Sequence, residues 1–228
     1  MCGRYTYLFT WKQLHRLMRL SDVPPEDLTP RYNVAPTQLV PAVRQDASGG
    51  RHGVILRWGL IPSWATDPSI GGRMINARGE SVAEKPAFRT ALSRRRCLVP
   101  VSGFYEWQVI PGQKAKQPWW IGRTDREPFA IAGLWERWTK GPEPLETFTL
   151  ITTTPNDLMA PLHDRMLVIV APQDYDLWLD PAITDSAAVT PLLRPAPVDG
   201  LEAYPISTRV NSPRFDDPSL IEPADASR

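Results

Sequence analysis

The chain has 228 residues, of which 42% are hydrophobic, and a formal net charge of +1. This length predicts one substantial domain or at most two small ones. No run of about 18 apolar residues occurs, and the start shows no basic stretch followed by an apolar one, so we expect no membrane span and no secretory signal.

The two halves of the chain differ in charge. Residues 1–100 carry 15 Lys and Arg against 7 Asp and Glu, whereas residues 101–228 carry 11 against 18. The difference indicates either an anionic partner bound by one face or halves that neutralise each other within one fold. Two cysteines, Cys2 and Cys97, are too few for a disulfide framework and favour a reducing, cytoplasmic location. The 21 Arg against 5 Lys favour a bacterial source.

Most of the elements that the sequence predicts are strand-like segments. Each is rich in β-branched or aromatic residues and is bounded by turn formers, which predicts a β-strand. These segments are Arg4–Leu8, Leu39–Val43, Val54–Leu60, Cys97–Val101, Phe104–Val109, Trp119–Gly122, Phe129–Trp135, Phe148–Thr153 and Met166–Val170.

Helical patterns are fewer and shorter. Thr10 is placed to cap a helix over residues 11–20, in which one face carries Trp11, Leu14, Leu17 and Met18. The further helices that we expect cover residues 80–85, 86–93, 156–162 and 174–179.

This order of elements predicts the fold class. Strands with short intervening helices indicate an α+β protein, built as a single domain on a curled, barrel-like mixed β-sheet with short peripheral helices. The 25 prolines are spread along the chain and mark no linker. We therefore expect one domain over residues 1–215 and a loosely attached tail over residues 216–228.

The opening MCGRY places a cysteine directly after the initiator methionine. Removal of Met1 would give Cys2 a free amine with a pKa near 7.7–8.0 beside a thiol with a pKa near 8.5. Such an aminothiol can condense with an aldehyde to a thiazolidine, or attack an acyl group as an N-terminal nucleophile. A small buried hydrophobic residue is the alternative interpretation of Cys2.

The stretch INARGES contains a second candidate group. Asn76 can donate and accept hydrogen bonds without adding charge, and Arg78 offers a planar fork for phosphate. The alternative is a simple turn, since Asn, Gly and Ser are common in loops.

A third candidate lies in CLVPVSGFYEW. Glu106 lies between Tyr105 and Trp107 in a predicted strand, and partial removal from water should raise its carboxyl pKa and suit it to proton transfer. A glutamate at a strand edge that faces solvent is the alternative. Cys97 opens an apolar run and is expected to serve packing.

His163 is the best of the three histidines for acid–base work, because it lies directly before an apolar strand and is followed by Asp164 and Arg165. No His or Cys pair has metal-ligand spacing, so we expect no metal site. No phosphate-binding glycine loop and no GxSxG elbow occur, and we expect no cofactor.

Eight motifs together resemble one known family. They run in order from residue 2 to about residue 170, and they are similar to those of the SRAP (SOS response-associated peptidase) family, whose members process abasic sites in DNA. The motifs are MCGRY, RYNVAPTQ, RWGLIPSWA, INARGES, KPAFR, RRCLVPVSGFYEW, TLITTTPN and LHDRM.

The resemblance implies a function and roles for single residues. It implies a protein that senses abasic sites in single-stranded DNA and forms a thiazolidine crosslink through Cys2 once Met1 is removed. Family members are credited with removing this residue themselves, although an ordinary methionine aminopeptidase suffices. We expect a monomer. Asn76 then positions the amine, Glu106 moves protons, and His163 assists imine formation and ring closure. The residues implied to contact DNA are Arg4, Arg78, Arg165 and Thr152.

Two positions depart from the family pattern. Ser102 stands where many members have Asp, which is expected to alter a turn. Ala65 stands where some members have a second tryptophan that wedges between bases, which leaves Trp64 or Trp58 to stack on DNA. Two other functions stay open from the residues alone: an N-terminal-nucleophile cysteine peptidase or amidohydrolase, and a non-catalytic reader of single-stranded DNA.

Overall fold

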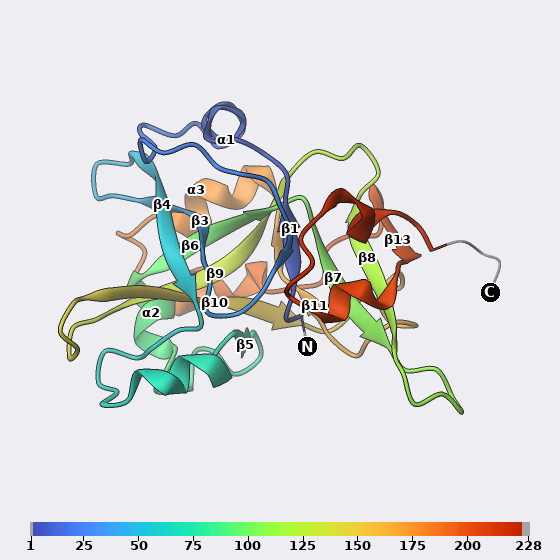
Figure 1. Ribbon diagram of the computed structural model, residues 1–228. Helices are drawn as coiled ribbons and strands as arrows, with labels where there is room; N and C mark the ends of the chain where they lie inside the picture. Colours follow the sequence, from blue (N-terminus) through green and yellow to red (C-terminus); the bar gives the residue numbers. More distant parts are fainter. Residues whose placement is uncertain (1, 225–228) are drawn as a thin grey trace.

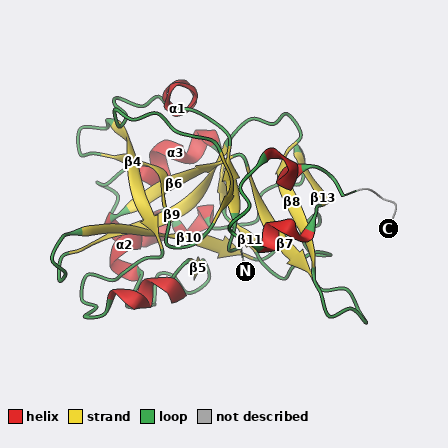
Figure 2. Ribbon diagram, viewed as in Figure 1, coloured by secondary structure: helices red, strands yellow, loops and turns green. Residues whose placement is uncertain are grey.

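The computed structural model describes residues 2–224, which form two β-sheets with short helices around them (Figure 1). Met1 and residues 225–228, the end of the expected tail, lie outside the described residues. In Figure 2 the helices are short and lie on the outside of the sheets, as expected for the α+β class.

The larger sheet closes on itself. β10 (Leu145–Thr153) pairs in parallel with β4 (Arg51–Trp58) and antiparallel with β9 (Phe129–Trp138). β3 (Leu39–Gln45) joins β4 to β6 (Arg96–Val101), and β6 returns to β9, which completes the ring. The expected curled, barrel-like mixed sheet is confirmed. Three short strands extend it: β5 (Asn76–Arg78), β11 (Met166–Leu167) and β12 (Ile169–Val170).

The second sheet is antiparallel and holds the start of the chain. Its order is β13 (Leu201–Pro205), β8 (Gln117–Arg123), β7 (Gly103–Gln108), β1 (Tyr5–Tyr7) and β2 (Arg31–Val34). Because β1 lies between β7 and β2, the residues just before β1 emerge beside β7. The sequence did not predict β2, β5 or β13.

The first helix, α1 (Trp11–Met18), has the predicted cap but ends earlier than predicted. The Thr10 hydroxyl accepts from the backbone N–H of Gln13, whose side chain accepts from the Thr10 N–H, which is a capping box. Arg19 takes a left-handed conformation with φ 53° and stops the helix.

Other predicted helices are only partly present. Residues 80–85 form turns, and the helix expected over 86–93 is α2 (Arg89–Arg94), which begins only after the Pro86 region. Turns also replace the helix expected over 156–162. The Asn156 side chain accepts from the Met159 N–H as a helix cap would, but Pro161 has no N–H to continue a helical ladder. The remaining helices are α3 (Tyr175–Leu179) and the 3₁₀ turns η1 (Pro68–Arg73), η2 (Pro172–Asp174), η3 (Ser186–Ala188), η4 (Thr190–Leu192), η5 (Thr208–Asn211) and η6 (Pro218–Ile221).

The strand expected over Met166–Val170 is divided in two. β11 pairs with β10, whereas β12 pairs with β9. Val168 lies between them and bonds to both partners: its N–H donates to Ile151 and its carbonyl accepts from Ala132. The segment therefore changes neighbours at Val168.

The C-terminal segment is packed against the body as far as residue 224. Leu220 in η6 is fully buried, and Ile206 bridges to Pro223. The Asp216 carboxylate pairs with Arg31 of β2. Residues 216–224, expected as a loose tail, are therefore part of the folded structure.

Ion pairs join the two halves of the chain. Among residues 2–224, basic groups of the first half pair with acidic groups of the second half, which fits halves that neutralise each other. These pairs are Arg31–Asp216, Arg44–Glu146, Arg51–Asp176 and Arg95–Glu136.

Candidate active site

Cys2 is buried directly before β1, with 1% of its surface exposed. Its carbonyl oxygen accepts a hydrogen bond of 2.7 Å from the Asn76 side-chain nitrogen. Asn76 begins β5, which the parallel pairing with β10 holds in place. The Asn76 oxygen, Oδ1, is buried and has no hydrogen-bond partner among the described residues. An acceptor without a partner is thus available at the start of the chain.

Glu106 reaches the same place from β7, the neighbour of β1. Its side chain is 1% exposed and forms a hydrogen bond with the Cys2 side chain. Burial raises the pKa of Glu106, which confirms the direction predicted from its apolar surroundings. Burial, and after it the Glu106 charge, raise the pKa of the Cys2 thiol. The Cys2 thiol and the Glu106 carboxyl are therefore disfavoured from being ionised at the same time, and at least one of the two groups keeps its proton.

His163 completes the cluster from the turn before β11. Its Nε2 lies 3.9 Å from the nearer Glu106 oxygen, and its imidazole is largely buried. Nδ1 lies 3.0 Å from the backbone nitrogen of Arg165 and 2.9 Å from an Asp164 oxygen. When Nδ1 accepts from the Arg165 N–H, the neutral ring carries its proton on Nε2, the nitrogen that faces Glu106.

Cys2, Asn76, Glu106 and His163 are thus brought together from four separate parts of the chain. The cluster contains a nucleophile, a neutral donor and two groups that can exchange protons, all removed from bulk water. This arrangement suits a reaction at a carbonyl carbon near the N-terminus.

The predicted arginines differ in how their charges are balanced. Arg165 donates to both Glu80 oxygens, at 2.7 and 2.9 Å, and to the Thr152 carbonyl oxygen at 2.8 Å. Arg4 has only uncharged acceptors and no carboxylate partner within residues 2–224. Arg78 is exposed at the end of β5. Arg4 and Arg78 are therefore the more available cations.

Thr152 lies in β10 and is 2% exposed. Its hydroxyl accepts from Arg165 at 3.2 Å and donates to the Ala77 carbonyl at 3.4 Å. Thr152 therefore connects Arg165 and β5 to β10, a strand of the barrel.

The two candidate tryptophans have different environments. Trp58 is fully buried, stacks on Phe148 and donates to the Ile75 carbonyl, so the prediction that it stacks on DNA is wrong. Trp64 is 55% exposed and its ring is open to a ligand. Cys97 is packed in β6, and burial raises its thiol pKa to about 12, as expected of an inert core cysteine.

Sequence reasoning missed two residues beside the site. Glu80 pairs with Arg165, and its place in INARGES is the signal that could have found it. Asn33, in RYNVAPTQ, is fully buried and contacts Arg4. A buried asparagine needs hydrogen-bond partners inside the protein, so an asparagine in a short strand is a signal for such a polar contact.

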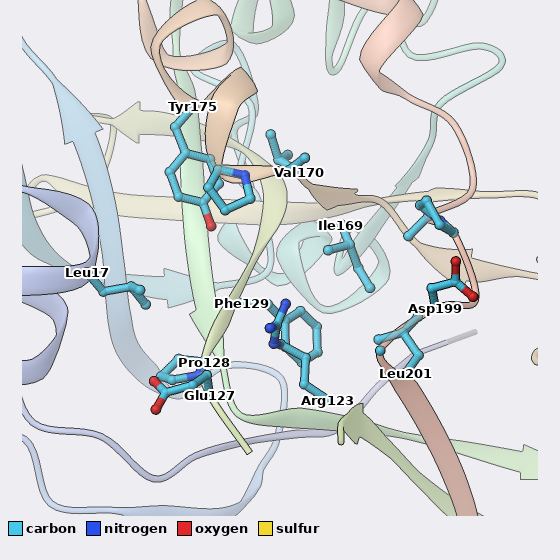
Figure 3. Close-up of a pocket in the computed structure, with 15 residues that line it drawn as sticks. Leu17, Arg123, Glu127, Pro128, Phe129, Ile169, Val170, Tyr175, Asp199 and Leu201 are labelled. Atoms are coloured by element: carbon cyan, nitrogen blue, oxygen red, sulfur yellow. The ribbon is translucent and has the colours of Figure 1, made fainter. Parts of the chain in front are cut away.

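An apolar pocket lies elsewhere in the fold. It has a volume of about 330 Å³ and lies between β12 and β13. Figure 3 shows Leu17, Phe129, Ile169 and Leu201 around it. None of the four clustered residues lines it. Within residues 2–224 no group of three His, Cys, Asp or Glu is arranged to hold a metal ion.

The longest helix in that range has eight residues, whereas a bilayer span needs about 20.

Comparison with known proteins identifies the family of this chain. The sequence profile of the family described as SOS response associated peptidase (SRAP) matches residues 1–213. The abasic site processing protein YoqW of Bacillus subtilis is 44% identical over 97% of this chain and 99% of its own. The abasic site processing protein HMCES of Gallus gallus is 32% identical over 85% of this chain and 66% of its own.

A solved structure has the same fold. The crystal structure of a protein from Bacteroides thetaiotaomicron superposes with a TM-score of 0.75 at 30% identity, over 85% of each chain. The matching family profile, the similar relatives and the shared fold cover the region that contains the clustered residues. The chain belongs to the SOS response-associated peptidase (SRAP) family.

Proposed function

We propose that this protein processes abasic sites in single-stranded DNA by forming a covalent thiazolidine link through Cys2. Relatives at 44% and 32% identity are named abasic site processing proteins. The observation that carries the proposal is the position of Cys2, whose carbonyl is held by Asn76 and whose thiol contacts Glu106. Removal of Met1 then exposes an amine within this cluster. We propose that the protein acts as a cytoplasmic monomer.

The proposed reaction balances without an added reagent. The Cys2 amine attacks the aldehyde carbon of the ring-opened sugar, and loss of water gives an imine. The Cys2 sulfur then adds to the imine carbon, and the thiol proton passes to the nitrogen. Both hydrogens of the amine leave with the carbonyl oxygen as water, and the thiol proton restores one hydrogen to the nitrogen. The product is a five-membered ring and no electron is transferred.

Glu106 and His163 can perform the proton transfers. Burial raises the pKa of Glu106, so it can hold a proton and release it to the sugar oxygen during ring opening or dehydration. His163 can relay a proton through Nε2, which faces Glu106. Asn76 holds the Cys2 backbone and supports the orientation of the amine.

The DNA strand would be bound by the arginines and by Trp64. Arg4 is two residues from the reacting amine and can meet the phosphate beside the abasic sugar. Arg78 is exposed on β5. Arg165 and Thr152 lie next to it, because Thr152 pairs with Arg78 across the sheet and bonds to Arg165. The exposed ring of Trp64 can stack on an unpaired base, which favours single strands.

The test uses oligonucleotides with and without one abasic site. Intact mass first establishes that Met1 is absent, and a heat-stable band shift then reports the link. We expect Cys2→Ala to abolish the band and Cys97→Ala, the matched control in the core, to retain it. Absence of a band with the trimmed wild-type protein would refute the proposal.

The same experiment separates the alternatives. Equal, heat-labile binding of damaged and undamaged strands would indicate a non-catalytic reader. Amide hydrolysis without a band would indicate an N-terminal-nucleophile hydrolase. We assign the word "peptidase" in the family description to removal of Met1. If that removal is autocatalytic, Cys2→Ala should retain Met1 when it is purified from cells without methionine aminopeptidase activity.

A further inference from the structure

Asn33 is a fully buried polar residue in β2, and every polar atom of its side chain is bonded. Its oxygen accepts from Arg4 Nη1 at 2.8 Å. Its nitrogen lies 2.8 Å from the Phe215 carbonyl oxygen, 3.1 Å from that of Ser212 and 3.2 Å from that of Val210. One amide thus joins the N-terminal arginine to the segment over residues 210–216.

The segment 210–216 also contacts Arg4 directly. Nη1 donates to the Val210 carbonyl at 2.8 Å, and Nη2 lies 3.3 Å from that of Asn211. Asp216 anchors the segment by accepting from the backbone N–H of Asn33 at 3.0 Å. Figure 1 shows this part of the chain, in red, running beside the blue β1.

The acceptors that Arg4 itself contacts are all uncharged: the Asn33 side-chain oxygen and two backbone carbonyl oxygens. The Arg4 guanidinium is therefore fixed in place while its positive charge stays uncompensated. Arg165 is different, since Glu80 neutralises it through two hydrogen bonds. A guanidinium held by neutral oxygens binds an anion without first losing a counter-ion. Preorganisation of this kind lowers the entropy cost of binding.

We propose that Asn33 is a positioning residue that holds Arg4 ready for a DNA phosphate beside the abasic sugar. This inference rests on the function proposed above. An asparagine fits the role because its oxygen accepts from Arg4 while its nitrogen donates to the carbonyls of segment 210–216. An aspartate of the same shape would neutralise Arg4 and could not donate.

The test is Asn33→Asp, assayed for binding to an undamaged single-stranded oligonucleotide over a range of salt concentrations. We expect about tenfold weaker binding at low salt. The plot of log affinity against log salt should be less steep by about 0.7, the value expected when one phosphate of a single strand is no longer neutralised. Asn33→Ser, which adds no charge, should weaken binding in the same direction.

A general decrease in stability must be separated from a failure of positioning. Met18→Ala creates a cavity in α1, where Met18 is fully buried, and should lower the melting temperature without changing the salt dependence. The proposal is overturned if folded Asn33→Asp keeps the wild-type slope. It is also overturned if Asn33→Ser binds as wild type, or if Met18→Ala reduces the slope equally.

Undamaged DNA keeps this test independent of the covalent chemistry. A wild-type protein that binds the strand but forms no link at an abasic site would refute the proposed reaction, and the Asn33 variants would still be compared by their salt dependence. A wild-type protein that forms the link while Asn33→Asp forms it at an unchanged rate and binds unchanged would refute the positioning role alone.

Discussion

The Asn76 side chain donates to the Cys2 carbonyl oxygen at 2.7 Å and so ties the barrel to the start of the chain. Asn76 belongs to β5, which is held by β10, whereas Cys2 precedes β1 of the other sheet. The bond therefore crosses between the two sheets at the place where Glu106 and Cys2 meet. A reactive terminus that would otherwise fray is held on rigid elements.

Removing this hydrogen bond should slow the reaction. We expect Asn76→Ala to form the DNA link about fivefold more slowly, because a neutral hydrogen bond of about 1 kcal/mol no longer orients the Cys2 backbone. Single-turnover kinetics with an abasic oligonucleotide measures the rate. Gln113→Ala, an exposed amide in the turn after β7, is the matched control and should react as wild type.

Glu106 predicts a pH dependence of stability. Its folded-state pKa is raised by burial, so above pH of about 4.3 the native state binds more protons than the unfolded state. The free energy of unfolding should therefore fall as pH rises through the raised pKa. Glu106→Gln should remove this fall and be more stable than wild type at pH 8, with a difference that shrinks towards pH 4.

The same substitution should reduce link formation by about 10²–10⁴-fold, the usual contribution of a general acid or base. Urea denaturation at several pH values gives the stability, and the gel assay gives the rate. Glu143→Gln, an exposed carboxylate between β9 and β10, should change neither. A Glu106→Gln variant less stable than wild type at pH 8 would contradict the prediction.

Glu80 should restrain DNA binding through Arg165. The two side chains form a pair with distances of 2.7 and 2.9 Å, and a phosphate must displace or share this partner. We expect Glu80→Gln to bind single strands more tightly, with a salt dependence steeper by about 0.7. Fluorescence anisotropy measures both quantities, and exposed Glu84→Gln is the control. Weaker binding by Glu80→Gln would show that the pair serves to place Arg165.

The two tryptophans should respond in opposite ways. Trp58→Ala empties a fully buried site and should cost about 3–5 kcal/mol of stability. Trp64→Ala removes an exposed ring and should leave stability within about 0.5 kcal/mol, while weakening single-strand binding by about 1–3 kcal/mol. Thermal unfolding and oligonucleotide binding on both variants provide the comparison. Unchanged binding by Trp64→Ala would remove it from the DNA surface.

His52 predicts a second pH effect, away from the site. Its ring nitrogens lie 2.6 Å from Asp22 and 2.7 Å from Asp46, and these carboxylates raise its pKa. The stabilisation is complete below the unfolded pKa of about 6.5 and disappears as pH rises through the folded value. His52→Gln should therefore be less stable than wild type at pH 6 and match it more closely at pH 9. His15→Gln, on the exposed side of α1, is the control in the same denaturation series.

Local patterns determined much of the fold. Strand segments such as Phe129–Trp135 and Phe148–Thr153 are recognisable by their β-branched and aromatic content, and the Thr10 cap marks the start of α1. The short strands β2, β5 and β13 carry too little pattern of their own. They exist because neighbouring strands supply hydrogen bonds, a cause that acts between distant residues.

The chemistry of the site was also readable in part. The position of Cys2 suggested an aminothiol, and the apolar neighbours of Glu106 predicted the direction of its pKa. The motif INARGES marked Asn76, although the residues alone left a simple turn open. The resemblance of eight ordered motifs supplied the relation among these residues, which spacing by itself does not give.

The tertiary structure decided which similar residues differ in role. Sequence presents Trp58 and Trp64 as equals, and only packing buries one and exposes the other. Sequence likewise gives Arg4 and Arg165 the same charge, but the fold places Glu80 against Arg165 and only neutral oxygens against Arg4. Residue type fixes what a side chain can donate or accept, whereas burial and partners far along the chain fix whether that capacity is already used.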